Sequence, residues 1–159
     1  MPIRATIISL AAIFLAFALE HLPMPSLLSW LQPLWLLLVL TVLILHAPQY
    51  FGLWLAIPLG LMMDVENNQL FGVHVLTFGV HIVLLQLLYR RLQTFHFLQL
   101  TLPVAVMVIL HQVVLYVAIA MVSENRTPVS IWQPALTSAL VWPWLYAIVH
   151  ISIRRLNLS

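Results

Sequence analysis

Residues 52–64 read GLWLAIPLGLMMD, and this stretch holds the most informative pattern in the chain. Gly52, Ala56, Gly60 and Asp64 recur at every fourth position. On an α-helix such a row drifts by only about 40° per step, so it predicts one narrow face of small residues that ends in an acid. In lipid, small residues let a second backbone approach closely. The row therefore predicts helix packing inside a bundle or a groove for a partner's helix, and Gly72 could serve the same end.

Composition places this stretch in a membrane protein. Of the 159 residues, 64% are hydrophobic and 6% are charged, and the mean hydropathy is +1.08. A soluble domain carries about 25% charged residues. So few charges cannot cover a water-facing surface, which excludes a soluble globular protein. The length fits one domain, and we predict a single integral membrane domain over residues 1–159.

The residue inventory argues against an enzyme and against cofactors. The basic residues are all Arg, and the chain has no Lys and no Cys. This excludes Schiff-base chemistry, thiol nucleophiles and Cys-ligated metals. The chain contains neither G-x-S-x-G nor H-E-x-x-H, so we expect no catalytic, cofactor-binding or metal-binding residues. The scattered Arg form no basic patch, so we expect no nucleic-acid partner.

Apolar runs predict an all-α polytopic membrane protein with six transmembrane helices. A span needs about 20 residues to cross about 30 Å of hydrocarbon. The second and third runs are short and meet at His46-Ala47-Pro48-Gln49, so a single re-entrant hairpin is an alternative for that pair. The runs that we interpret as spans are 5–19, 30–46, 50–65, 70–89, 98–122 and 131–153.

Charge placement favours six spans and sets the orientation. With six spans, Arg126 and all four acids fall on one side of the membrane. The positive-inside rule then places the opposite side, which carries both termini, in the cytoplasm. The residues on that cytoplasmic side are Arg4, Arg90, Arg91, Arg154 and Arg155.

Asp64 is expected near the outer edge of the hydrocarbon, about 21 Å along the third span. It also stands at a helix C-terminus, where the macrodipole disfavours an anion, so it needs a compensating partner. One candidate is Arg126. The other is the backbone N–H groups at the start of the next helix, with Asn67 or Asn68 as its N-cap. An acid at membrane depth is a functional candidate, and a turn-stabilising cap is the structural alternative.

The histidines are predicted to be structural. His74 and His81 are seven residues apart, hence about 10 Å apart along one helix. No His pair has the i, i+4 spacing that would place two ligands on one metal ion. His111 and Gln112 fall near the middle of the fifth span, so they should face the bundle and form hydrogen bonds. We expect His111, Gln112 and His74 to be buried polar groups.

Several stretches together resemble the MreD family of the bacterial rod-shape machinery. They keep the order and spacing of that family over nearly the whole chain. Departures are the absence of Gly in 65–69 after Asp64, Gln32 before Pro33, and His111 where an acid can stand. The stretches are LPMP at 22–25, QPLWLLL at 32–38, Gly52 to Gly60, LMMD at 61–64, LFGVHVL at 70–76, and VWPW at 141–144 leading to Arg154-Arg155.

The resemblance implies a function that composition does not. MreD-like proteins are non-enzymatic scaffolds of the cell-elongation complex in the bacterial cytoplasmic (inner) membrane. They bind the single-span protein MreC and act with the RodA glycosyltransferase, a penicillin-binding transpeptidase and MreB filaments, which supports peptidoglycan synthesis and cell shape. Their fold resembles the S component of energy-coupling-factor transporters. The lipid bilayer is a further partner, and a homo-oligomer is compatible with the sequence.

Two functions are therefore carried forward from the sequence. For the scaffold, the candidate contacts with MreC are the row Gly52, Ala56, Gly60 and Asp64 together with Gly72. A reserve contact is Trp142-Pro143-Trp144, where Pro143 should kink the sixth helix. The alternative is a small-molecule or lipid-binding transporter-like subunit, whose pocket would be lined by Asp64, Asn67, Asn68, His74 and His111.

Overall fold

The computed structural model describes residues 3–23, 25, 32–96, 98–122 and 132–157. Every regular element in these residues is helical, which confirms the all-α prediction. A short 3₁₀ turn, η2, precedes α3. The elements are α1 (Ile3–Glu20), α2 (Trp35–His46), η2 (Leu53–Leu55), α3 (Ala56–Glu66), α4 (Val73–Leu92), α5 (Thr101–Val122) and α6 (Trp132–Asn157).

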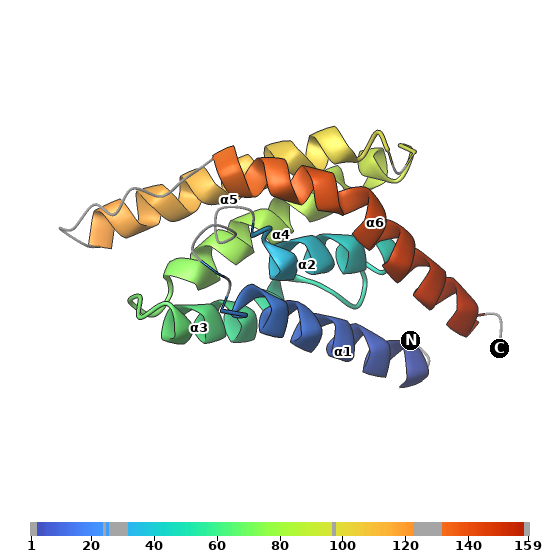
Figure 1. Cartoon of the computed structure of the whole chain (residues 1–159), viewed down its shortest axis with the longest axis horizontal. Coiled ribbons are helices and arrows are strands. Elements are labelled where there is room, and N and C mark those ends of the chain that lie inside the picture. The colour runs from blue at the N-terminus through green and yellow to red at the C-terminus, as the bar shows by residue number, and fades with distance from the viewer. Residues whose placement is uncertain (1–2, 24, 26–31, 97, 123–131, 158–159) are drawn as a thin grey trace.

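Helix α2 is the centre of the bundle. All ten residues from Leu36 to Leu45 are buried, so this helix has no lipid-facing side. It packs against α1, α4 and α6, while α3 packs mainly against α4 (Figure 1). A helix that is apolar all round has no face suited to water, so it lies in a protein core or in lipid. The sequence WLLLVLTVLILH therefore belongs to the core.

Within the described residues, three helices are long and apolar enough to cross a membrane: α4, α5 and residues Trp132–Ser152 of α6. Helices α1 and α2 are also apolar, but their apolar stretches are shorter. Helix α3 has 11 residues and so rises only about 17 Å. The chain is an all-α membrane protein, and six complete crossings stay a prediction.

The second and third helices begin later than the sequence suggested. Helix α2 begins at Trp35, because its N-cap residue Leu34 has a non-helical backbone with φ −80° and ψ 78°. Helix α3 begins at Ala56, after the 3₁₀ turn. Pro58, which falls within the apolar run 50–65, therefore stands in the first turn of α3. Backbone N–H groups have no intrahelical acceptor there, so Pro58 interrupts no hydrogen bond.

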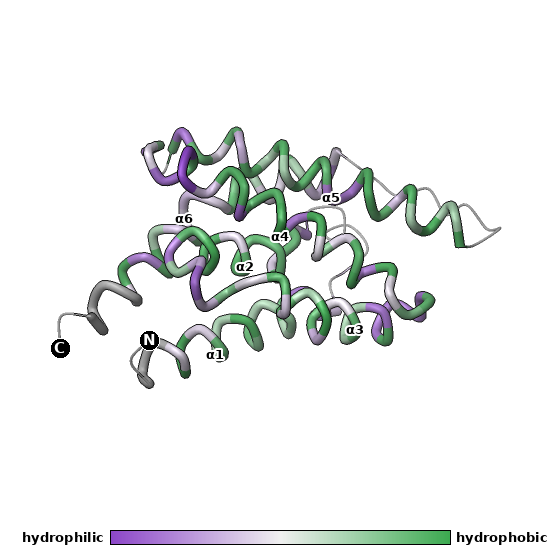
Figure 2. The backbone as a smooth tube through the Cα atoms, turned by 180° about the vertical axis from the view of Figure 1, so that it is seen from behind, coloured by the Kyte–Doolittle hydropathy of each residue, from purple (hydrophilic) through white to green (hydrophobic). Residues whose placement is uncertain are grey.

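The two chain termini and the turn after α3 lie at opposite ends of the molecule. The N-terminal end of α1 and the C-terminal end of α6 lie together (Figure 1). The hydrophilic turn after α3 lies at the far end, and the helices between are largely hydrophobic (Figure 2).

Helix α6 continues through Pro143 and changes direction along its length. This bend follows from the backbone donor that proline lacks.

Candidate functional site

Asp64 lies in the last turn of α3 and is fully buried, with 0% of its surface exposed. Its carboxylate accepts a hydrogen bond from the Gly72 N–H at 2.7 Å through Oδ2. The other oxygen, Oδ1, accepts from the His74 N–H at 2.8 Å. Both donors are at the start of α4, which begins at Val73. A side chain of one helix thus caps the next helix.

This cap gives the Asp64 carboxylate the compensating partner that its position at a helix C-terminus requires. The first N–H groups of a helix lack intrahelical acceptors, and the macrodipole favours an anion at that end. Of the partners that the sequence left open, the backbone of α4 is the one observed, and Arg126 lies outside the described residues. The expectation that Asn67 or Asn68 caps α4 is wrong, because the N-cap is Gly72. Asn68 instead adopts a positive φ of 50° within the turn.

His74 completes the cluster. Its Nδ1 lies 2.8 Å from Asp64 Oδ1, and both side chains are buried. Since the carboxylate can only accept, His74 Nδ1 carries the hydrogen. Asp64 therefore receives three hydrogen bonds within a single hairpin. A buried charge is tolerated when it is hydrogen-bonded in this way.

At Gly60, one turn before Asp64, the backbones of α3 and α4 lie in close contact. A Cβ atom built on Gly60 would lie 2.4 Å from both the Cα and the N of Val75. The carbonyl carbon of His74 would be 2.8 Å away. Backbone atoms cannot rotate aside as a side-chain tip can, so only glycine fits. The small-residue face is thus occupied by a helix of this same chain.

The row is shorter than its spacing suggested. Gly52 is not helical, with φ −132° and ψ −166°, so it does not share the face of Ala56, Gly60 and Asp64. A Cβ on Gly52 would instead approach Gln86 Nε2 at 3.3 Å. The helix starts only after the 3₁₀ turn. Periodicity alone could not reveal where α3 begins.

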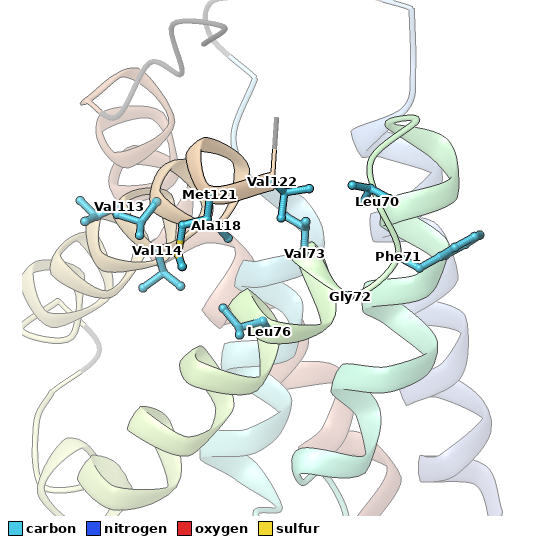
Figure 3. A pocket seen from close by; sticks show the side chains of 11 residues that line it. Leu70, Phe71, Gly72, Val73, Leu76, Val113, Val114, Ala118, Met121 and Val122 are labelled. Carbon is cyan, nitrogen blue, oxygen red and sulfur yellow. The ribbon is translucent and has the colours of Figure 1, made fainter. Parts of the chain in front are cut away.

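Gly72 has a different use. Its φ of +108° lies in the left-handed region, which favours glycine. A Cβ at Gly72 would meet nothing within 4 Å, so conformation and not space selects the residue. Gly72 also borders an apolar cavity of about 650 Å³ between α4 and α5 (Figure 3).

A second polar cluster lies deeper in the bundle. The Thr41 hydroxyl donates to the Leu37 carbonyl at 2.7 Å, which leaves its oxygen to accept from His81 Nε2 at 3.0 Å. His111 packs edge-on against His81, with ring centroids 5.8 Å apart. Gln112 is buried beside His111 in α5. Within the described residues, His111 Nδ1 and Gln112 Oε1 have no hydrogen-bond partner.

The sequence missed several participants in such clusters. Thr41 is the one hydroxyl in the apolar run of α2, and that isolation was the available signal. At the other end of the bundle, His46 Nε2 lies 2.8 Å from His150 Nδ1, and Tyr146 stacks on His150. His46 and His150 are 104 residues apart, so no local pattern predicts that they meet. No group of three potential metal ligands occurs in the part of the chain that the structure describes.

The residues of the VWPW motif do not act as one surface. Trp142 is fully buried, whereas Trp144 is 76% exposed. Pro143 between them is half-buried. Trp142 packs against Tyr146, with ring centroids 5.7 Å apart. Only Trp144 is therefore available for contact outside the bundle.

Comparison with known proteins gives a consistent result. The family model described as rod shape-determining protein MreD matches residues 3–151. The rod shape-determining protein MreD of Haemophilus influenzae is 31% identical over an alignment of 147 residues that covers 89% of this chain and 86% of that protein. No solved structure matches the chain, so the expected likeness to S components stays a prediction. The chain belongs to the MreD family of rod shape-determining proteins.

Proposed function

We propose that this protein is a non-enzymatic scaffold that binds MreC in the bacterial cytoplasmic membrane. In this role it supports peptidoglycan synthesis by RodA and its transpeptidase partner above MreB filaments. Family membership supplies the role in cell shape. The scaffold proposal rests on helix α3, which packs against α4 on one side and has an exposed face on the other. The Arg distribution supports cytoplasmic N and C termini.

The bare side of α3 is an apolar stripe. Ile57, Leu61 and Val65 are spaced by four residues and are 57%, 38% and 60% exposed. Residues at this spacing share a helix face. Since α3 packs mainly against α4 and the 3₁₀ turn, this face is open to a further helix. We propose it as the surface that meets the transmembrane helix of MreC.

In this proposal Gly60 and Asp64 affect the contact with MreC only indirectly, through their own contacts with α4. They hold α3 in place, and they do not touch the partner themselves. Trp144 of α6 is the reserve contact, because it is exposed while Trp142 is not. This assignment replaces a direct role for the small-residue face with a positioning role.

Detergent co-purification with an MreC partner tests the proposal. A variant with Ile57→Ala, Leu61→Ala and Val65→Ala should lose the complex, because it removes the large side chains of the exposed α3 face. Its matched control carries Leu102→Ala, Val106→Ala and Leu110→Ala, an exposed row on α5 with the same spacing. Loss of the complex in the control alone would place the contact on α5 and reject the α3 face.

The geometry favours the scaffold over a solute-binding subunit. The pocket proposed for a solute was to be lined by Asp64, Asn67, Asn68, His74 and His111, of which His111 is buried in the bundle beside His81. Asp64 and His74 are bonded to each other, and Asn67 and Asn68 are exposed. The Asn67 side chain also donates within the hairpin, to the Met63 carbonyl at 2.9 Å.

A further inference from the structure

The exposed apolar face of α3 is too short for a whole bilayer. It begins at Leu53 and Trp54 in η2 and ends at Val65, next to the exposed acid Glu66. The 3₁₀ turn adds about 6 Å, and the helical residues as far as Val65 add about 15 Å. The hydrocarbon of a typical bilayer is about 30 Å thick. The face therefore falls short by about 9 Å.

The contacts of α3 with α4 give the same length independently. At one end, a Cβ built on Gly52 would lie 3.3 Å from Gln86 Nε2. At the other end, the Gly72 N–H donates to the Asp64 carboxylate. The rise along α4 from Gly72 to Gln86 is about 21 Å. Gln86 is exposed, so a polar side chain marks the level at which the apolar face of α3 begins.

Side chains suited to a membrane–water interface stand at both ends of this short face. Tyr50 and Trp54 are exposed at its start, and Trp54 Nε1 donates to the Tyr50 carbonyl at 3.3 Å. Trp and Tyr are enriched where hydrocarbon meets water. Glu66 and Asn67 are exposed at the other end, and a charge inside hydrocarbon is costly. Both ends of α3 therefore belong at an interface.

Helix α5 presents a longer apolar face to lipid. The rise from its first to its last exposed apolar residue is about 30 Å, which equals the hydrocarbon thickness. The faces of α3 and α5 thus differ by about 9 Å in apolar length. The exposed apolar residues of α5 include Leu102, Val106, Leu110, Val113, Val117, Met121 and Val122.

One level of the bundle shows this difference directly. His81 of α4 lies beside His111 of α5, with ring centroids 5.8 Å apart. The two helices run antiparallel (Figure 1), so five residues after His81 and five before His111 reach one level, at Gln86 and Val106. This level lies about 7.5 Å nearer to the end where α1 begins and α6 ends. The apolar face of α3 stops here, whereas that of α5 continues to Leu102.

We propose that the bilayer is thinner along α3 than along α5, and that this mismatch promotes the contact of α3 with MreC. Lipid must deform to cover a face that is too short, at a free-energy cost that grows with the mismatch. A full-length transmembrane helix seated on α3 presents a longer apolar face to lipid and so relieves the deformation. The second part rests on the proposed binding of MreC, and the first part does not.

A depth measurement on the full chain alone tests the thinning. The chain has no cysteine, so a nitroxide can be attached to Leu53→Cys and Val106→Cys, at positions that are 51% and 48% exposed. Electron paramagnetic resonance compares the access of oxygen and of a water-soluble nickel chelate to each label in 18-carbon phosphatidylcholine bilayers. The label at Val106 should lie about 6 Å deeper, because it stands one turn inside Leu102. Equal depths of the two labels would overturn the proposal.

The depth difference should also follow the thickness of the bilayer. It should shrink in bilayers of 14-carbon chains, which are closer to the length of α3, and grow in bilayers of 22-carbon chains. Circular dichroism confirms that both labelled variants are folded in each lipid. A depth difference that stays the same at all three chain lengths would overturn the proposal, because lipid deformation would not be its cause.

Association with MreC in the same bilayers tests the second part. Energy transfer between labelled full chain and labelled MreC should report about tenfold tighter binding in 22-carbon than in 14-carbon lipid. Leu53→Gln shortens the α3 face further and should steepen this dependence, whereas Leu102→Gln, at the same end of α5, should not. Equal binding at every chain length would overturn this part. No complex in any lipid, with the depth difference retained, would uphold the thinning and reject α3 as the contact with MreC.

Discussion

Two corners of the molecule use the same device with different strength. At each, an acid at the end of one helix accepts hydrogen bonds from the start of the next. Glu20, the last residue of α1, accepts from the Leu36 N–H at 2.9 Å. Asp64 accepts three hydrogen bonds of 2.7–2.8 Å. The donors are the Gly72 N–H, the His74 backbone N–H and His74 Nδ1. The corner at Asp64 is the more highly bonded one.

The difference lies in side-chain length and backbone approach. Asp64 has a short side chain and is fully enclosed, and Gly60 brings the α4 backbone against α3 one turn earlier. Glu20 is half-buried, with a longer side chain that reaches a single N–H group of α2. Gln32 supports this corner by donating to the Glu20 carbonyl. We infer that α3 and α4 move as one unit, whereas the α1–α2 corner can yield.

The largest effect is expected from Gly60→Ala. The new methyl group would collide with the Val75 backbone, so α3 must move away from α4 at a cost of about 3 kcal/mol or more. Thermal unfolding in detergent measures this loss. Gly79→Ala is the matched control, because its Cβ would meet only Leu53 Cδ1 at 3.6 Å. Equal melting of the two variants would contradict the close contact at Gly60.

Asp64→Ala should rank second. It leaves two backbone N–H groups and His74 Nδ1 without their acceptor, which should destabilise the protein by about 2–3 kcal/mol. The same melting experiment detects it. Glu66→Ala, two residues on and exposed, should stay within about 0.5 kcal/mol of wild type. An unchanged melting point for Asp64→Ala would show that the cap contributes nothing.

Glu20→Ala sharpens the comparison. It removes one capping bond to Leu36, so the expected loss is about 1 kcal/mol. Hydrogen exchange should quicken at the start of α2 while α4 keeps its protection. If this variant is as unstable as Asp64→Ala, the two corners are equivalent and the distinction fails.

Of the four substitutions, Gly72→Ala should destabilise the protein least, by no more than Glu20→Ala does. There is room for the methyl group, so only the positive φ opposes it, at about 1 kcal/mol. Gly72→Asn should cost less, because Asn tolerates the left-handed region better. A larger loss for Asn than for Ala in the melting experiment would assign the cost to space.

The sequence predicted the class of fold and the importance of the 52–64 stretch for physical reasons. Composition alone required a membrane protein, and small residues at every fourth position indicate close helix contact. It could not reveal which helix makes that contact, because the partner of Gly60 is set by tertiary packing. Nor could it show that Gly52 falls before the helix. The bond between Thr41 and His81, 40 residues apart, is equally non-local.

The face that meets MreC can be mapped most directly by cysteine crosslinking, since the chain contains no cysteine of its own. Single cysteines are placed at Leu61 and Val65 on the bare side of α3 and at Leu102 and Val106 on α5. Each is paired with a cysteine scan along the transmembrane helix of MreC in membranes. We predict disulfide-linked heterodimers from the α3 positions at a helical repeat, and none from α5. Crosslinks from α5 or from Trp144→Cys, with none from α3, would contradict α3 as the contact.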